Sequence, residues 1–329
     1  MKGLRLLRRK DITIRPMSLD DMEDIRFVGQ EAWSDLASHD IGRKVKYPIR
    51  SRQIIEGYMS TEPKGCLVAE RKGEIIGAAY SHVWGSIGWL GPFEVLPEHQ
   101  NTGVGSALLE EAEHFLRDRG VKVLGLETMS HIPKNLHFYL SHEYHPTSLT
   151  LITDKTLDSS VSKTRSELPE EGEIKEARVI DHNRILHAVK RIGNSIYPGL
   201  DPSCEFEILC RKELGVTFFL EKNGEILGVA LLHTYQRQND DDYSSIKLLL
   251  VDPLMDRVDS GFVTLLRSCE DRSLSLGRSR IYARFPVKED DTYRTMVSMS
   301  YRIKGANIRF IKGAQYSENG VYNLSSWAG

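Results

Sequence analysis

Residues 95–109 read VLPEHQNTGVGSALL, and this stretch passes from strand-like to turn-like to helix-like sequence. A β-rich run stops at Pro97, a small turn holds Gly103 and Gly105, and an amphipathic helix follows. The apolar residues of that helix fall at helical spacing, which predicts one buried stripe. Its members are Val104, Leu108, Ala112, Phe115 and Leu116.

The start of this helix is a predicted anion site. A helix N-terminus presents unpaired N–H groups and the positive end of a dipole. Glycines let an anion approach the backbone closely, so a pyrophosphate fits there. The run is not a P-loop, because no G-K-S/T follows, and it lacks the third glycine of the dinucleotide fingerprint. The alternative is a glycine turn that only packs the helix on the sheet.

Size and composition predict two ordinary globular domains. The chain has 329 residues, an apolar fraction of 40% and a charged fraction of 27%, and a chain of this length exceeds one typical core. The formal net charge of -2 gives no reason to expect nucleic acid or an anionic membrane as the main partner. No window is long and apolar enough to cross a bilayer, and residues 1–10 read as a basic, solvated leader.

The four cysteines predict neither a disulfide framework nor a zinc site. They stand far apart, without C-x-x-C spacing, which favours reduced thiols in a cytoplasmic protein. We expect no metal site, because the histidines between residues 131 and 145 lack the H-E-x-x-H spacing of a zinc helix.

The two halves of the chain repeat one another. Residues 69–79, AERKGEIIGAA, reappear as residues 220–230, LEKNGEILGVA, and each copy reads as a hairpin with a glycine turn. Ile14 matches Ile174, and Pro97 with Gly105 matches Pro253 with Gly261. We therefore predict duplicated domains at residues 1–155 and 173–329. The polar stretch from Asp154 to Glu173 is the predicted linker, with bounds at 156–172.

The first copy reads as a mixed α/β domain, an α+β arrangement of a mixed sheet with helices. Strands are expected from Ile12, at Cys66–Arg71, Glu74–Trp84 and Ile87–Leu96, at Val123–Thr128 and at Ser148–Thr153. Helices are expected from Ser18 to about Trp33, after Pro48, from the glycine turn to about Arg119 and near Asn135–Ser141.

At this point the sequence resembles the GNAT superfamily of acetyltransferases. The signature of that family is Gln or Arg, two residues, Gly, one residue, then Gly or Ala, and Gln100, Gly103 and Gly105 fill those places. The resemblance covers nearly all of residues 11–153 and, more weakly, the second half. It implies two tandem GNAT-like domains, each a mixed, mostly antiparallel sheet flanked by helices, and acetyl-CoA as cofactor.

The resemblance implies where acetyl-CoA would bind. The strand ending at Val95 and the strand ending near Thr128 should splay apart, with the pantetheine arm along the backbone of Phe93 to Val95 as an added strand would lie. Pyrophosphate would contact the loop amides, and an N–H near Val95 would stabilise the oxyanion. The predicted cofactor-binding residues are Phe93, Val95, Gln100, Asn101, Thr102, Gly103, Val104, Gly105, Ser106 and Asn135.

Three residues are candidates for proton transfer. An amine with a pKa near ~10 must lose a proton before it attacks, and Glu94 is the first candidate base, with Glu127 second. The alternatives are a solvated or lysine-paired Glu94 and a Glu127 that orients the substrate amine. The resemblance implies Tyr139 as the acid that protonates the departing thiolate, and a core aromatic is the alternative. Glu143-Tyr144 departs from the Gly-Phe of many relatives.

The second copy departs from the signature where the cofactor would bind. Asp256 stands in the place of Gln100 and Asp259 in the place of Gly103, and Gly261 alone matches. An aspartate adds a Cβ and a negative charge where a phosphate needs free amides. We therefore expect a degenerate second copy that does not bind CoA well.

The sequence thus predicts an N-acetyltransferase that passes an acetyl group directly to a primary amine on a small molecule or peptide. An enzyme using a longer acyl donor, a non-catalytic acyl-CoA sensor or scaffold, and a peptide-binding module stay open. The sequence does not choose the acceptor, nor between a monomer and a homodimer.

Overall fold

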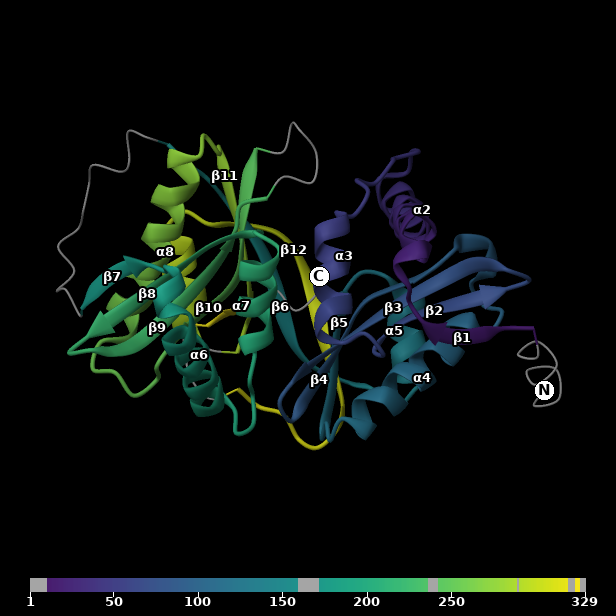
Figure 1. The fold of residues 1–329 in the computed structure, drawn as a ribbon. Helices are drawn as coiled ribbons and strands as arrows, with labels where there is room; N and C mark the ends of the chain where they lie inside the picture. Colours follow the sequence, from purple (N-terminus) through teal and green to yellow (C-terminus); the bar gives the residue numbers. More distant parts are fainter. Residues whose placement is uncertain (1–10, 159–171, 236–241, 289, 319–322, 326–329) are drawn as a thin grey trace.

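The computed structural model describes residues 11–158, 172–235, 242–288, 290–318 and 323–325. The predicted leader at residues 1–10 and most of the predicted linker lie outside the described residues. The described chain forms two lobes side by side, with β6 (His145–Thr156) and β12 (Arg302–Gly313) between them (Figure 1).

The strands follow the order that the sequence predicts, with the same hairpins in both halves. The remaining strands are β1 (Thr13–Pro16), β2 (Cys66–Arg71), β3 (Glu74–Trp84), β4 (Ile87–Val95), β5 (Val123–Met129), β7 (Glu173–Glu176), β8 (Gly215–Lys222), β9 (Glu225–His233), β10 (Tyr243–Val251), β11 (Arg280–Pro286) and β13 (Leu324–Ser325).

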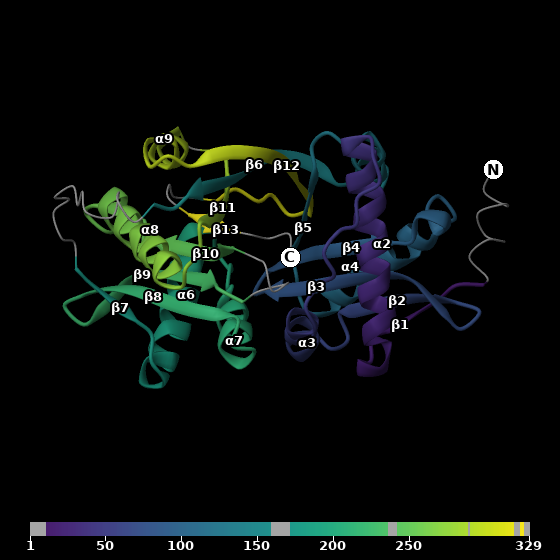
Figure 2. The same ribbon diagram turned by 90° about the horizontal axis from the view of Figure 1, so that it is seen from above.

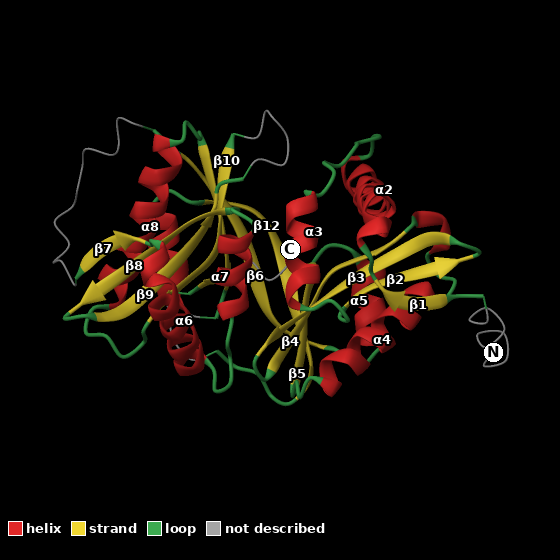
Figure 3. Ribbon diagram, in the orientation of Figure 1, coloured by secondary structure: helices red, strands yellow, loops and turns green. Residues whose placement is uncertain are grey.

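Helices flank these strands in both lobes (Figure 3). They are α2 (Met22–Ile41), α3 (Arg52–Thr61), α4 (Val104–Asp118), α5 (Pro133–Leu140), α6 (His182–Ile196), α7 (Ser203–Arg211), α8 (Val258–Ser275) and α9 (Asp290–Ser298), with 3-10 turns η1 (Leu19–Asp21), η2 (Pro97–His99) and η4 (Val179–Asp181).

The described strands form one sheet of 13 strands rather than one sheet per half. Its order is β1-β2-β3-β4-β5-β12-β6-β11-β10-β9-β8-β7, with β13 pairing β10. The pairings β4–β5 and β10–β11 are parallel, and the other pairings of the described strands are antiparallel. The expected mixed, mostly antiparallel arrangement with flanking helices is therefore confirmed.

The two halves exchange their last strands. β12 belongs to the second half of the chain, yet it inserts between β5 and β6 of the first half. β6 in turn lies between β12 and β11 of the second half, and the two strands run next to each other in Figure 2. Each half therefore needs a strand from the other to complete its part of the sheet.

The repeated sequence forms the same hairpin in both halves, β2–β3 in the first and β8–β9 in the second. The β2–β3 hairpin has a register irregularity at Ala69/Glu70, and the β8–β9 hairpin has one at Leu220/Glu221. Both turns use two residues with positive φ, 54° and 84° in the first hairpin and 53° and 83° in the second. Positive φ at both central residues is the geometry that matches the twist of paired strands.

The hydrophobic core is shared between the halves. One cluster joins Tyr58 and Trp84 of the first half to Phe206 and Leu248 of the second. Helices α3 and α7 contact each other above it, with an ion pair of 3.0 Å between Lys212 Nζ and Glu56 Oε2. Two further clusters lie under α4 in the first half and under α8 in the second.

Three local expectations need correction. β6 continues to Thr156, so Asp154 to Thr156 are strand rather than linker, because they pair with β11. The first long helix runs past Trp33 to Ile41 and ends at Gly42 with φ 71°, and Ile12 precedes the first strand.

Among the described helices, none has the length and apolarity needed to cross a bilayer.

Candidate functional site

The two parallel strands of the first half separate at one end. β4 pairs β5 from Ile87 opposite Val123 to Leu90 opposite Leu126. Beyond Leu90, the described pairings of β4 are with β3 alone, while β5 continues along β12 as far as Met129. We call the space bordered by residues 91–95 of β4 and the end of β5 the first gap.

Main-chain groups of β4 face this first gap. The N–H of Leu96 donates to the Ile76 carbonyl of β3 at 3.0 Å. Successive residues of a strand direct their main-chain groups to opposite sides, so the N–H groups of Phe93 and Val95 point away from β3. The Val95 carbonyl accepts a bond from Gln100 Nε2 at 3.1 Å, which ties the signature glutamine to the strand.

The glycine loop leads from η2 into α4. Asn101 and Gly103 have positive φ, 59° and 95°, and a side chain at Gly103 would strain that conformation. The first bond of the helical ladder runs from the Ala107 N–H to the Gly103 carbonyl at 3.0 Å. The amides of Val104, Gly105 and Ser106 lie before that bond, as they must in the first turn of a helix.

Helix α5 covers one side of the loop. A Cβ built on Gly105 would lie 3.4 Å from the Phe138 ring, and the Phe93 and Phe138 rings are 6.0 Å apart. Sequence reasoning missed two polar partners of the predicted loop residues, Lys134 and His142, because no local pattern marked them. Ser106 Oγ lies 3.0 Å from His142 Nε2, and Lys134 Nζ donates to Gln100 Oε1 at 3.0 Å. Thr102 Oγ1 donates to the His99 carbonyl.

Glu94 is buried and engaged by three donors. Arg50 donates to both carboxylate oxygens, at 3.0 Å and 2.7 Å, and Trp33 Nε1 donates to Oε1 at 2.7 Å. Burial opposes the charge of Arg50, but Glu94 offsets it and raises the pKa of the guanidinium above its usual value. The carboxylate is therefore paired with arginine rather than with lysine or solvent.

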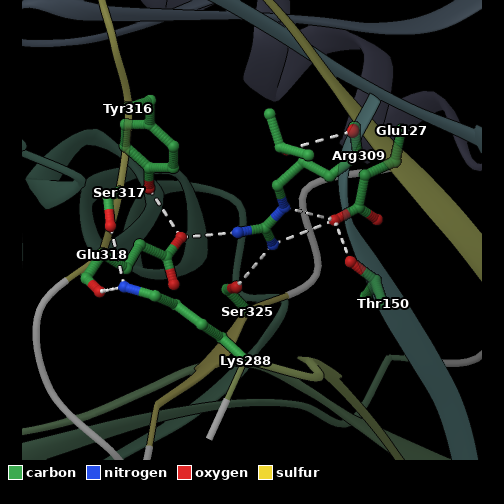
Figure 4. Close-up of polar contacts among 9 residues, drawn as sticks. Glu127, Thr150, Lys288, Arg309, Tyr316, Ser317, Glu318 and Ser325 are labelled. Carbon is green, nitrogen blue, oxygen red and sulfur yellow. Dashed lines mark hydrogen bonds and ion pairs between the residues drawn. The ribbon is translucent and has the colours of Figure 1, made fainter. Parts of the chain in front are cut away.

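Glu127 projects from β5 into a second buried network, drawn in Figure 4. Its Oε1 accepts from Thr150 Oγ1 at 2.8 Å and from Arg309, with N–O distances of 3.0 Å and 2.9 Å. Its Oε2 is buried and has no hydrogen-bond partner among the described residues. Arg309 comes from β12, so the strand exchange delivers the counterion to Glu127.

The same arginine reaches the C-terminal segment. Arg309 Nη1 donates to Glu318 Oε1 at 2.5 Å and Nη2 donates to Ser325 Oγ at 3.3 Å. Tyr316 donates its hydroxyl proton to Glu318 Oε1 at 2.6 Å. Burial opposes the charge of Arg309, but Glu318 and Glu127 outweigh it and raise the pKa of the guanidinium. Sequence reasoning missed this cluster, whose members lie far apart in the chain.

Tyr139 and Asn135 occupy α5, as expected for that segment. The Tyr139 ring packs within 6.0 Å of the rings of Tyr144 and Phe310, and burial raises the pKa of its hydroxyl above the usual value. Asn135 Nδ2 donates to Thr128 Oγ1 at 3.2 Å, so this asparagine joins α5 to the end of β5. Trp84 and Trp89 are almost fully buried and act as packing.

The equivalent loop of the second half has a different surface. Asp259 lies in the first turn of α8, and the pKa of its carboxyl is lowered by a hydrogen bond from Arg257. A Cβ on Gly261 would lie 2.9 Å from the methyl carbon of Met255. A methionine side chain therefore covers the one glycine that matches the signature.

Comparison with known proteins agrees with this geometry. Residues 30–144 match the model of the acetyltransferase (GNAT) family. No protein of curated function matches the sequence. Among solved structures, a candidate acetyltransferase from Pyrococcus horikoshii is similar over 97% of this chain and 96% of its own, with 18% identity and a TM-score of 0.68.

Two further structures share the tandem arrangement. A tandem GNAT protein from the clavulanic acid biosynthesis pathway covers 93% of this chain and 99% of its own, at 12% identity and a TM-score of 0.57. N-myristoyltransferase from Saccharomyces cerevisiae, with bound myristoyl-CoA, covers 92% and 78%, at 10% identity and a TM-score of 0.63. The match to the GNAT acetyltransferase model therefore lies in the first half of the chain, and the whole chain has a tandem GNAT-like fold.

Proposed function

We propose that the first half is an acetyl-CoA-dependent N-acetyltransferase that acylates a primary amine by direct attack. The observation that carries this proposal is the first gap itself. On one side lies the edge of β4, whose Phe93 and Val95 N–H groups point away from β3. Next to it lies the N-terminus of α4, whose first three N–H groups have no acceptor within the helix. The two features together suit a ligand with an extended amide arm and a pyrophosphate.

Acetyl-CoA would supply an acyl group activated as a thioester. The amides of Val104, Gly105 and Ser106 would bind the pyrophosphate, with Gly103 giving access to the backbone. The outward N–H of Phe93 would pair with the pantetheine arm, and that of Val95 would stabilise negative charge on the acyl oxygen. Gln100 and Asn135 would shape the site, because they bond to Val95 and Thr128 near the ends of β4 and β5. Asn101, with positive φ, and Thr102, bonded to the His99 carbonyl, would shape the loop itself.

The reaction needs a group that takes a proton from the amine. The nitrogen forms a bond to the acyl carbon, the C–S bond breaks, and the amine proton goes to a carboxylate. Glu127 has one carboxylate oxygen without a partner among the described residues, whereas both oxygens of Glu94 are engaged. These contacts support Glu127 as the base and Glu94 as a residue that holds β4 against α2.

Tyr139 would protonate the departing thiolate. A tyrosine hydroxyl holds its proton at neutral pH, as a general acid must, and burial raises the pKa of this hydroxyl above its usual value and so makes it a weaker proton donor.

A second candidate function is an acyl-CoA sensor without chemistry. The specific observation in its favour is that Glu94 and Tyr139 both have structural surroundings, an arginine pair and an aromatic cluster. In that case the first gap would bind acyl-CoA, and substitution of Tyr139 would change nothing measurable.

Thiol release from acetyl-CoA across a panel of amines distinguishes the two functions. The panel contains aminoglycosides, polyamines, amino acids and peptides with free N-termini, because small-molecule and peptide acceptors both fit the chemistry. We expect turnover with one class, its loss in Gly103→Asp, and a lower kcat in Tyr139→Phe. Tight CoA binding in calorimetry without turnover on any amine would support the sensor.

A reducing, cytoplasmic setting is also part of the proposal. All four cysteines are free, and burial raises the pKa of the Cys66 and Cys269 thiols, which keeps them protonated.

A further inference from the structure

The second half contains a gap equivalent to the first gap. β10 pairs β11 in parallel from Tyr243 opposite Arg280 only as far as Ser245 opposite Tyr282. Beyond this point the two strands stop pairing, as β4 and β5 do after Leu90 and Leu126. We call the space bordered by residues 247–251 of β10 and the end of β11 the second gap.

The main-chain orientation is also equivalent. The Asp252 N–H donates to the Leu227 carbonyl of β9 at 2.8 Å, just as Leu96 donates to Ile76 of β3. Alternation along the strand then turns the amides of Leu249 and Val251 toward the second gap. Leu249 thus has the position that Phe93 has in the first half.

Strand β13 of the same chain lies in the second gap. β13 pairs β10 antiparallel, with Leu248 opposite Ser325 and Leu249 opposite Leu324, and it also contacts β11. Leu324 has no exposed surface and belongs to the apolar cluster under α8. An extended peptide is usually bound in this way, by main-chain pairing with the edge of a strand and by burial of one of its side chains.

Polar contacts at Ser325 and at residues 316–318 before β13 hold this part of the chain in place. Ser325 Oγ accepts from Arg309, and Glu318 accepts from Arg309 and from Tyr316. Lys288 Nζ donates to Ser317 Oγ at 2.8 Å and to the Glu318 carbonyl at 2.6 Å. The segment therefore bonds to β12, which completes the first half, and to the end of β11, which borders the second gap.

We propose that the second gap is a peptide-binding site whose ligand is the β13 segment of this chain, residues 323–325, seated where the first gap would hold the pantetheine arm. This placement rests on the proposed function for its comparison with pantetheine, but the peptide site stands on the β13 pairing alone. The loop beside it suits a peptide better than a diphosphate, because Asp259 adds negative charge and Met255 covers Gly261. One acetyl-CoA per chain is the expected stoichiometry.

Hydrogen exchange of the unmodified protein tests this, with the first half as an internal control. Peptide fragments that cover residues 87–95 and 243–251 are followed by mass spectrometry with and without acetyl-CoA. We expect the gap-facing amides of residues 91–95 to exchange quickly and to slow when acetyl-CoA is added. The equivalent amides of residues 247–251 are expected to exchange slowly even without acetyl-CoA, and their exchange is expected not to change when it is added.

The two proposals fail differently in this experiment. Fast exchange at 247–251, or slowing there on addition of acetyl-CoA, would overturn the peptide site. Unchanged exchange at 91–95 would overturn the proposed function and leave the slow exchange at 247–251 as support for the peptide site.

A disulfide trap gives an independent reading. Residues directly opposite in an antiparallel pair have Cα atoms about 4.5–5.5 Å apart, so Leu249→Cys with Leu324→Cys is expected to cross-link on oxidation. The matched control, Ile246→Cys with Leu324→Cys, moves one cysteine by about 10 Å along β10 and is too far to bridge. Equal cross-linking of both pairs, mapped by mass spectrometry, would contradict a seated segment.

Discussion

Glu94 and Glu127 lie on the two strands that border the first gap, and their hydrogen bonds give them different chemistry. Glu94 holds Arg50 and Trp33, whereas Glu127 keeps one buried oxygen without a described partner. A buried acceptor without a partner costs free energy, and such costs are retained where a site needs them. These contacts are the reason for proposing a stabilising role for Glu94 and proton transfer for Glu127.

Glu94→Gln is expected to destabilise the fold strongly. It removes the counterion of the partly buried Arg50, and breaking a buried pair from one side costs about 3–5 kcal/mol. The measurement is thermal unfolding, with Glu98→Gln as control, since Glu98 is exposed and such changes stay within about 0.5 kcal/mol. Equal melting of the two variants would leave Glu94 free for a catalytic role.

Asp21→Asn tests a pH-dependent contact at the start of α2. Arg15 and Ser18 donate to the Asp21 carboxylate, and the Arg15 hydrogen bond lowers its pKa to about 2. Because the pKa of the Asp21 carboxyl is lower in the folded than in the unfolded protein, its charge stabilises the fold at pH values above the unfolded pKa of about 3.8. This stabilisation is lost as the pH falls toward 2. We expect a loss of about 1–2 kcal/mol at pH 7, shrinking below pH 4.

Denaturant unfolding of wild type and Asp21→Asn between pH 7 and pH 3 measures that difference. Asp20→Asn, a change at the exposed neighbour, is the control and is expected to match wild type throughout. A difference independent of pH would show that the carboxylate charge is not involved.

At the scale of single elements, α4 carries a positive-φ glycine at each end. Gly103 precedes its first turn with φ 95°, and Gly120 follows its last turn with φ 81°. The two positions have similar backbone requirements, but only the N-terminal one adjoins the first gap. The pair therefore separates the stability of the helix from its binding function.

Gly103→Ala and Gly120→Ala are expected to destabilise by similar amounts, about 1–2 kcal/mol, because both force alanine into the left-handed region. Only Gly103→Ala is expected to weaken acetyl-CoA binding, by ~10-fold or more, since its loop amides must contact the phosphates. Calorimetric titration with acetyl-CoA measures the difference. Equal affinity in both variants would argue that the cofactor binds elsewhere.

The elements themselves were predictable where their signals are local. The two hairpins and α4 follow from turn glycines and apolar spacing within about a dozen residues. The exchange of β12 and β6 was not, because pairing between Glu127 and Arg309 depends on residues far apart in the chain. Trp33 shows the same limit, since the sequence predicted it as the approximate end of a helix, whereas its indole N–H bonds to Glu94, 61 residues away.

At the scale of the whole molecule, the two halves depend on each other. β5 pairs β12, and one apolar cluster includes α3 and α7 residues from both halves. A fragment of residues 1–155 would expose the β5 edge and half of that cluster, and exposed edges favour aggregation.

We expect residues 1–155 to lack a cooperative monomeric fold and residues 156–329 to restore it when both are co-expressed. Circular dichroism melting and gel filtration of the fragment, alone and with its complement, provide the measurement. A cooperatively melting monomer of residues 1–155 would contradict this dependence and support the domain boundary predicted from sequence.

The exchange of β6 and β12 also bears on how such a chain could arise. A polypeptide with one copy of these elements could complete its sheet in the same way by exchanging its last strand with that of an identical molecule. Joining two copies in tandem makes the strand exchange intramolecular, so that it no longer depends on protein concentration. Once joined, the copies are free to diverge, and in the second copy the gap between the two parallel strands holds β13.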